Sequence, residues 1–212
     1  MNESTHSPLT VEQWAGAQHL ALTLLFTDIV DSTAIGTQLG DNRWIDDLFN
    51  HFARARYYAV WYDCIVVKVI GDSLMMAFRT SSDAVLFALN FAADTGVDYI
   101  SIRVGINSGQ VQIRENDIYG LTVNFTSRVQ HLLPGEGILI SDSVKDDYEK
   151  TFGGSSETKF IEVQKEVKSF GSKRLWRVVT PSLREKFRDQ AKVKLTKFSI
   201  KRHLPIGLSP SS

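Results

Sequence analysis

The sequence predicts an α+β fold in which helices pack on a mostly antiparallel sheet. Short apolar runs of strand length alternate with segments whose apolar residues recur at helical intervals, and turn-forming residues separate them. Two pairs of runs are spaced as hairpins, which favours antiparallel pairing. With 212 residues, of which 43% are hydrophobic and 23% charged, the chain can bury one core of ordinary size.

We expect one domain at residues 21–180, with an N-terminal extension at 1–20 and a basic tail at 181–212. The tail holds eight Lys or Arg residues against Glu185 and Asp189, so it carries +6 and leaves −6 for the rest of a chain of zero net charge. We read the tail as a solvated, partly disordered extension and assign it no function.

Each element of the first half is predicted from its own pattern. The run 21–26 is almost wholly apolar, as in a strand covered on both faces. From Asp41, a candidate N-cap, apolar residues recur at helical spacing. Two runs flank the turn-forming pair Gly71 and Asp72 and predict a hairpin. The expected elements are strands at 21–26, 64–70 and 74–78, and helices after residue 28, from residue 41, and from a cap at 81–83 to about 94–96.

The second half continues this alternation. Ser108 and Gly109 separate two strand-like runs and predict a second hairpin. Pro134 and Gly135 stop the helix that precedes them. The expected elements are strands at 100–107, 110–114 and 137–140, a helix at 121–133, and strands at 159–163 and 175–179 that bracket a loop with Lys165, Lys168, Gly171 and Lys173.

Two predicted strands each deliver an aspartate to one region. Asp28 closes the first strand, and Asp72 lies in the turn after the second. Two buried carboxylates side by side repel each other, at a cost of the order of several kcal/mol, unless a cation neutralises them. Oxygen ligands favour Mg²⁺ or Mn²⁺, and the N–H groups of the helical turns after Asp28 can hold phosphates. The pair predicts a two-metal site for a nucleoside triphosphate, although a lone strand-end aspartate is more often a turn former or N-cap.

Composition indicates a cytoplasmic protein. The single cysteine, Cys64, lies in an apolar run and allows no internal disulfide. No segment approaches the roughly 18 apolar residues that span a bilayer, and the polar N-terminus is unlike a secretion signal. We therefore expect neither a membrane nor a nucleic-acid partner.

Four motifs resemble the catalytic domain of the class III nucleotide cyclases, in order and spacing, over about residues 20–180. They are Phe26-Thr-Asp28-Ile29, Lys68-x-x-Gly71-Asp72, Arg103-Val-Gly-Ile, and Asp117-Ile-Tyr-Gly-x-x-Val-Asn124-x-x-x-Arg128. The resemblance implies a ferredoxin-like, cyclase-type antiparallel-rich sheet and a homodimer with active sites at its interface. Each site would take its metal aspartates from one chain and its base-reading and catalytic residues from the other.

The resemblance also implies a role for each motif residue. Asp28, Asp72 and the Ile29 carbonyl would bind two Mg²⁺ or Mn²⁺ ions. One ion would lower the pKa of the ribose 3′-hydroxyl, and the other would hold the triphosphate. The hydroxyl would then attack the α-phosphate and expel pyrophosphate. Phe26 is a further nucleotide-binding position.

Arg128 occupies the family position of the cation that stabilises the transition state. Asn124, one helical turn earlier on the same face, would orient the ribose. Lys168 or Lys173 would bind the β and γ phosphates, and ordinary solvated charge is an equal interpretation of that loop.

Lys68 and Asp117 fall at the two positions that read the purine in adenylate cyclases. Taken alone, this pair favours ATP and disfavours GTP. An aspartate, however, accepts a hydrogen bond from uracil N3–H or a cytosine amine as readily as from adenine. Several neighbouring residues depart from the family pattern and would narrow a base pocket or alter the phosphate site. They are Val69 in place of threonine, Asp63-Cys64 in place of a Gly-Gly turn, the preceding Trp61-Tyr62, and Asp31 in place of a glycine.

A cyclase domain without an attached sensor resembles the pyrimidine cyclases of bacterial antiphage systems. We therefore expect a UTP or CTP cyclase whose product is read by a separate cyclic-nucleotide effector. An adenylate cyclase that makes cyclic AMP is the alternative. A catalytically dead nucleotide-binding domain is a minor one, because both aspartates, Asn124 and Arg128 are retained.

Overall fold

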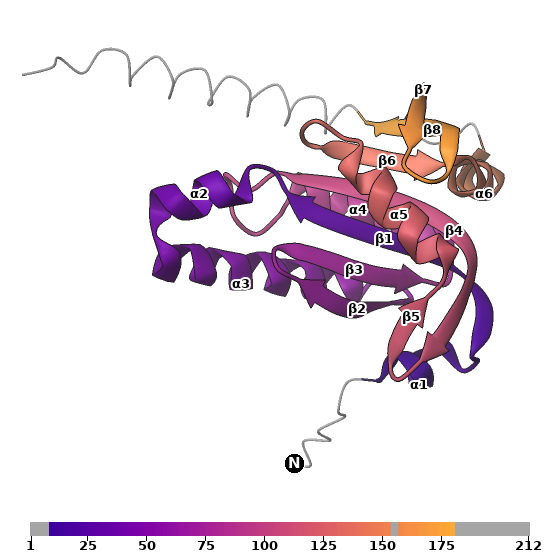
Figure 1. Cartoon of the computed structure of the whole chain (residues 1–212), viewed down its shortest axis with the longest axis horizontal. Coiled ribbons are helices and arrows are strands. Elements are labelled where there is room, and N and C mark those ends of the chain that lie inside the picture. Colours follow the sequence, from indigo (N-terminus) through magenta and orange to yellow (C-terminus); the bar gives the residue numbers. More distant parts are fainter. Residues whose placement is uncertain (1–8, 154–156, 181–212) are drawn as a thin grey trace, which may run out of the picture.

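The computed structural model describes residues 9–153 and 157–180, and within these ranges the chain forms one eight-stranded sheet with six helices (Figure 1). The strands are β1 (His19–Ile29), β2 (Cys64–Ile70), β3 (Ser73–Phe78), β4 (Ile102–Arg114), β5 (Asp117–Tyr119), β6 (Gly137–Ser141), β7 (Lys159–Val167) and β8 (Gly171–Val179). The helices are α1 (Val11–Ala15), α2 (Ser32–Leu39), α3 (Asp41–Ala59), α4 (Ser81–Ala93), α5 (Leu121–His131) and α6 (Asp142–Phe152). The predicted basic tail lies outside the described residues.

The strand order is β2-β3-β1-β4-β6-β8-β7, and the short β5 pairs with β4 beside this path. Strands β4 and β6 pair in parallel, and the other pairs are antiparallel. The predicted antiparallel-rich α+β fold is confirmed. Because β1 lies between β3 and β4, its C-terminal end faces the hairpin turn that carries Asp72.

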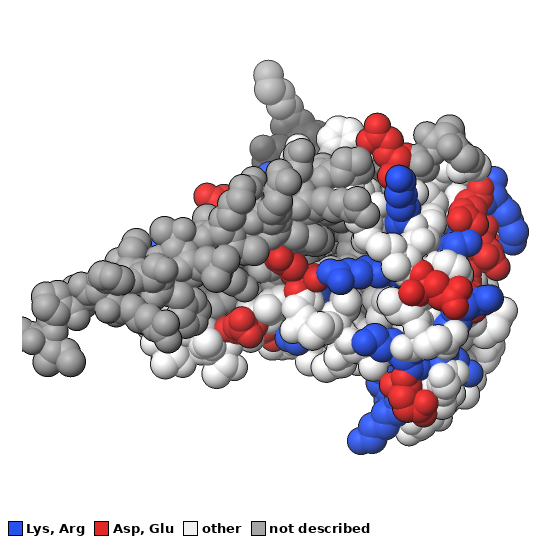
Figure 2. Space-filling view, turned by 90° about the horizontal axis from the view of Figure 1, so that it is seen from above, with Lys and Arg blue, Asp and Glu red and all other residues white. Residues whose placement is uncertain are grey.

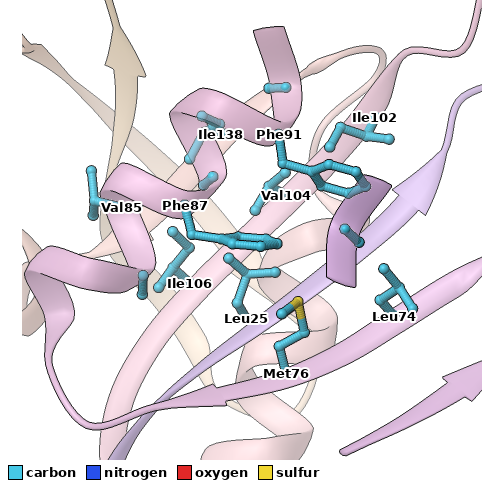
Figure 3. Close-up of a cluster of buried hydrophobic side chains, with 14 of the residues drawn as sticks. Leu25, Leu74, Met76, Val85, Phe87, Phe91, Ile102, Val104, Ile106 and Ile138 are labelled. Atoms are coloured by element: carbon cyan, nitrogen blue, oxygen red, sulfur yellow. The ribbon is translucent and has the colours of Figure 1, made fainter. Parts of the chain in front are cut away.

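The sheet has an apolar core on both faces. Helices α3, α4 and α6 cover one face, and α1 and α5 lie against the other. Figure 3 shows Phe87 and Phe91 of α4 directed at Leu25, Met76 and Val104 of the sheet, and all five side chains are fully buried. Each such side chain contributes about 1.5–3 kcal/mol by burial, which makes the sheet a rigid support for groups at its edge.

Part of the predicted N-terminal extension is folded onto the sheet. Trp14 of α1 is 8% exposed, and its indole N–H donates to Asp63 Oδ1 at 2.9 Å. At the other end of the helix, the Val11 N–H donates to Asn116 Oδ1 at 2.5 Å. Helix α1 therefore connects the start of β2 with the turn between β4 and β5.

The predicted hairpin at Ser108 and Gly109 is wrong. Residues 102–114 form one strand because β1 pairs with it along its whole length, from His19 opposite Gln112 to Ile29 opposite Ile102. The chain turns later, at Glu115 and Asn116, which adopt φ values of 50° and 61°. This turn contains no glycine or proline to reveal it.

The predicted loop between the last two strands is also wrong. Strands β7 and β8 continue through it, so Lys165 pairs with Lys173, and the turn shrinks to residues 168–170. The helix caps differ by one residue as well: Gly40 precedes α3, and the Thr80 hydroxyl caps α4 by accepting from the Asp83 N–H. Asp41 is thus the first helical residue of α3, where its charge favours the helix dipole.

Candidate active site

The sheet brings the two predicted metal aspartates together. Asp28 is the penultimate residue of β1, and Asp72 lies in the turn between β2 and β3. The neighbour of Asp72 in the chain, Ser73, donates its hydroxyl proton to Asp28 Oδ1 at 3.0 Å. One residue further along, the Leu74 N–H donates to Thr27 Oγ1 at 3.2 Å, which fixes the hairpin against β1.

Asp28 also has a cationic partner that the sequence motifs did not reveal. Arg103 lies opposite Asp28 in the β1–β4 pairing, and its guanidinium forms an ion pair with Asp28 Oδ2. The two side chains are 26% and 16% exposed. Arg103 appeared in the sequence as part of a motif, but its role as a cross-strand partner depends on a register that sequence alone does not specify.

One carboxylate oxygen of Asp72 lacks a partner among the described residues. Its Oδ2 atom is buried and has no hydrogen-bond partner among the described residues. An unpaired buried carboxylate oxygen is costly, and a bound cation removes that cost. Ile29, whose carbonyl is the third predicted ligand, ends β1 directly after Asp28.

This donor set fits a hard divalent cation. Carboxylate and carbonyl oxygens are the ligands that Mg²⁺ and Mn²⁺ prefer. Within the described ranges, no cluster of three or more His, Cys, Asp or Glu side chains is present. Backbone oxygens and the substrate's own phosphates would therefore complete the coordination.

Lys68 and Asp117 form the second predicted group, and the structure brings them together. Lys68 Nζ lies 2.5 Å from Asp117 Oδ2, although β2 and β5 are not neighbours in the sheet. The β2–β3 pairing shifts register between Val66 and Lys68, so the intervening Val67 is an extra residue in the strand. Such bulges redirect side chains near active sites, and this one was not predicted.

Helix α5 carries the two predicted catalytic residues. Asn124 is exposed on its first turns, and Arg128 follows four residues later. The Arg128 guanidinium donates to the Lys168 carbonyl and lies over the Phe170 ring, 5.3 Å from its centroid. The structure therefore brings Arg128 and Lys168 together, through the main chain of the β7–β8 turn.

No direct contact joins the predicted metal ligands to the predicted catalytic residues within the described chain. Among the described residues, no hydrogen bond or ion pair connects Arg128 or Asn124 with Asp28 or Asp72. Of the remaining predicted positions, Phe26 is 6% exposed and belongs to the core, and Lys173 lies within β8.

Three of the residues expected to narrow the base pocket make other contacts or face solvent. The Tyr62 ring packs edge-on against Phe87 of α4, with centroids 6.1 Å apart, and Asp63 binds the Trp14 indole. Trp61 is 71% exposed. Asp31, at the start of α2, has a left-handed backbone with φ of 58°, which explains why a glycine suits this position.

Charge on the described surface and the apolar character of the helices bear on the predicted partners. Figure 2 shows basic and acidic side chains interspersed over the uncovered part of one face. Among the helices of the described ranges, none has both the length and the apolar character needed to cross a membrane.

Comparisons with curated proteins place cyclases among the relatives. A pH-sensitive adenylate cyclase of Mycobacterium tuberculosis is 29% identical over 135 residues, which cover 59% of this chain and 32% of that protein. An adenylate cyclase of Streptomyces coelicolor is 30% identical over 88 residues, covering 41% and 23%. An uncharacterised M. tuberculosis protein is 36% identical over 81 residues, covering 38% and 28%. The chain thus aligns with about a third or less of these relatives' length.

Solved structures agree with the fold. The catalytic core of a rhodopsin-guanylyl cyclase with converted specificity, in complex with ATPαS, superposes with a TM-score of 0.66 at 25% identity, covering 77% of this chain and 98% of that one. An adenylyl cyclase from P. aeruginosa gives a TM-score of 0.65 at 23% identity, with coverage of 76% and 95%. The family model for the adenylate and guanylate cyclase catalytic domain matches residues 16–175. This chain belongs to that family.

Proposed function

We propose that the chain converts a nucleoside triphosphate into a 3′,5′-cyclic nucleoside monophosphate and pyrophosphate, and that its preferred substrate is UTP or CTP in the cytoplasm. The observation that carries the cyclase assignment is the meeting of Asp28 with the hairpin of Asp72, whose buried Oδ2 lacks a partner among the described residues. Family membership supports nucleotide cyclase activity, and the base is the new element of the proposal.

In this proposal, Asp28, Asp72 and the Ile29 carbonyl hold two Mg²⁺ or Mn²⁺ ions, which activate the ribose 3′-hydroxyl and neutralise the triphosphate. Arg128 presents a fixed positive charge to the α-phosphate, where negative charge develops as pyrophosphate leaves. Asn124 orients the ribose, and the exposed Lys168 binds the outer phosphates.

The lack of a direct contact between the two groups among the described residues supports a homodimer with composite sites. Large apolar side chains are exposed at the tip of the β2–β3 hairpin and where β5 leads into α5, close to both groups in sequence. They are Val69 (41% exposed), Ile70 (50%), Tyr119 (47%) and Leu121 (74%). Burial of such side chains against a second copy would place Arg128 of one chain beside the carboxylates of the other.

A pyrimidine fits the base-reading pair by hydrogen bonding. The Lys68 ammonium is a donor and Asp117 an acceptor, which matches uracil O4 and N3–H, or cytosine N3 and its amine. The bulge at Val67 directly precedes Lys68, and Lys68 reaches Asp117 although their strands are not neighbours in the sheet.

ATP is the second candidate, and a specific observation favours it. Adenine N1 and its amine present the same acceptor and donor to Lys68 and Asp117. The intact ion pair at 2.5 Å is the pair that adenine would need. The aligned relatives from Streptomyces coelicolor and M. tuberculosis carry the name adenylate cyclase.

The test is purified protein with Mn²⁺ and ATP, GTP, CTP or UTP separately, with products resolved by mass spectrometry. We expect cyclic UMP or cyclic CMP from the wild type and no product from Asp72→Ala, which circular dichroism should show to be folded. Cyclic AMP as the main product would transfer the assignment to the second candidate. No cyclic product from any of the four substrates would overturn the proposal.

We also propose that the cyclic pyrimidine nucleotide is a second messenger of antiphage defence, and that a separate effector binds it. Cells carrying the wild-type chain should accumulate cyclic UMP or cyclic CMP after phage challenge, and cells carrying Asp72→Ala should not. Equal product levels with and without phage would contradict this role.

A further inference from the structure

The turn between β7 and β8 contacts the Arg128 guanidinium through two uncharged groups. The Lys168 carbonyl accepts a hydrogen bond from the guanidinium, and the Phe170 ring lies beneath it at 5.3 Å. A carbonyl oxygen and an aromatic face both attract a cation without carrying a negative charge. Arg128 is therefore held in place while its full positive charge remains available.

Other arginines of the described chain are held differently. Several form ion pairs with carboxylates, namely Arg43, Arg54, Arg79, Arg103 and Arg174. No ion pair involving Arg128 is present among the described residues. A carboxylate partner would offset the positive charge that a triphosphate needs. A catalytic arginine is therefore better held by uncharged groups, such as a carbonyl oxygen and an aromatic ring.

The Phe170 ring is itself fixed. Its edge packs against Phe125 of α5, with centroids 5.1 Å apart and planes at 77°. The Phe170 N–H donates to the Val167 carbonyl at 2.8 Å, and Ser169 adopts φ of 66°, so the turn is tight. Val167 is fully buried beneath it. The ring thus links the strand pair to the helix that carries Arg128.

We infer that Phe170 is a positioning residue that presents Arg128 to the triphosphate, with the β7–β8 turn as a preformed guanidinium cradle. The inference rests on the proposed function, since it gives Arg128 its role at the reacting phosphate. It also explains why Lys168, a second predicted phosphate ligand, lies in the same turn. The β7–β8 turn thus contains the main chain of Lys168 and also holds the guanidinium of Arg128.

The first test compares kinetic constants. Phe170→Leu should lower kcat by about 10- to 100-fold with little change in KM, because small displacements of a charge at the reacting centre cost mainly transition-state stabilisation. Phe170→Tyr keeps the ring and should restore most of the rate. Phe160→Leu is the matched control: it removes a partly buried ring from the other end of β7, packed 5.5 Å from Tyr148, and should leave kcat within about twofold.

The second test uses the guanidinium ion as a probe. Millimolar guanidinium should partly rescue Arg128→Ala by entering the cradle, and the concentration needed should rise in Arg128→Ala/Phe170→Leu. A merely structural role for Phe170 would not change this concentration. Size-exclusion chromatography and urea unfolding should confirm that every variant is folded and has the wild type's oligomeric state.

Three results would overturn the inference: a kcat of Phe170→Leu equal to wild type, the same loss in Phe170→Tyr, or guanidinium rescue that is absent or independent of Phe170. Absence of any cyclic product from the wild type would instead refute the proposed function. The two failures are therefore distinguishable.

Discussion

Gly105 shows how a single missing side chain sets the position of helix α5. A Cβ atom at Gly105 would lie 2.4 Å from the Gln130 backbone nitrogen and 2.8 Å from its Cα. These are main-chain atoms of α5, so they cannot yield without moving the helix. The glycine of the Arg103-Val-Gly-Ile motif therefore permits α5 to lie directly on β4.

We predict that Gly105→Ala destabilises the protein by about 1–3 kcal/mol, the usual cost of overpacking. It should also lower kcat at least tenfold, because Arg128 lies two residues from Gln130 and moves with it. Gly135→Ala is the control, since a Cβ there meets nothing within 4 Å. Urea unfolding and steady-state kinetics would measure both effects. A Gly105→Ala protein as stable and active as the control would contradict this packing argument.

His51 is the buried residue that should dominate stability in mild acid. It is fully buried in α3, its Nδ1 lies 2.9 Å from the Thr95 carbonyl, and its ring stacks on Phe91. Burial lowers the pKa of His51 from 6.5 to about 4, against smaller opposing effects of the Thr95 hydrogen bond and the Asp72 charge. The folded protein therefore keeps His51 neutral at pH values where the unfolded chain protonates it.

The sign of the pH effect follows from this lowered pKa. Well above pH 6.5 the His51 imidazole is neutral in both the folded and the unfolded protein, so it adds no pH dependence to stability. As pH falls from 6.5 to 4, the unfolded state gains the proton first, so the free energy of unfolding should fall by about 3 kcal/mol. Urea titrations at pH 7, 5.5 and 4.5 would measure it. His51→Phe should show a shallower decline, and an equally steep one would assign the effect to other groups.

At the scale of elements, α1 acts as a clamp between two distant parts of the sheet. It binds the start of β2 through Trp14 and the β4–β5 turn through Asn116, and these are the elements that carry Lys68 and Asp117. The Arg79 guanidinium adds a contact over the Trp14 ring at 4.8 Å. The helix is short, yet it contacts both elements that carry the proposed base-reading pair.

We predict that Trp14→Ala costs about 3–5 kcal/mol, as for other buried tryptophans, and raises KM for the nucleotide more than it lowers kcat. Trp61→Ala removes a tryptophan that is 71% exposed and should change stability by less than about 0.5 kcal/mol. Urea unfolding and substrate titrations would compare the two variants. Similar losses in both would mean that α1 contributes little.

Elements with a strong local pattern were predictable. The apolar run of β2 and the turn at Gly71 appear where their patterns placed them, and the helix predicted at 121–133 ends two residues early, at His131. The carboxylate site was predictable for the same reason, since both aspartates follow such runs.

Other features depend on partners that are distant in sequence. Strand β4 continues past Gly109 because β1 pairs with it, and β7 and β8 extend because they pair with each other through the charged positions Lys165 and Lys173. Local propensity cannot reveal this. The Arg103 ion pair and the Phe170 cradle likewise arise from strand register and helix packing.

At the scale of the whole molecule, the two halves of the site are expected to meet between chains. Asp28→Ala and Arg128→Ala should each be inactive alone. An equimolar mixture that exchanges subunits should regain about a quarter of wild-type activity, since about half of the dimers are mixed and each has one intact site. Activity of mixed and unmixed samples would be measured after size-exclusion chromatography confirms dimers. Mixed dimers without activity would show that each site is built within one chain.

The ion pair between Arg103 and Asp28 has a consequence for the resting protein. The fold supplies its own positive charge to one of the two carboxylates, so the folded chain does not depend on a metal to offset that charge. In the proposed site, metal binding at Asp28 would exchange one cation for another, with a smaller net gain than filling an uncompensated acidic site. Asp72, whose buried Oδ2 lacks a partner among the described residues, would gain more from a bound cation, so any stabilisation of the fold by divalent ions is expected to come through Asp72.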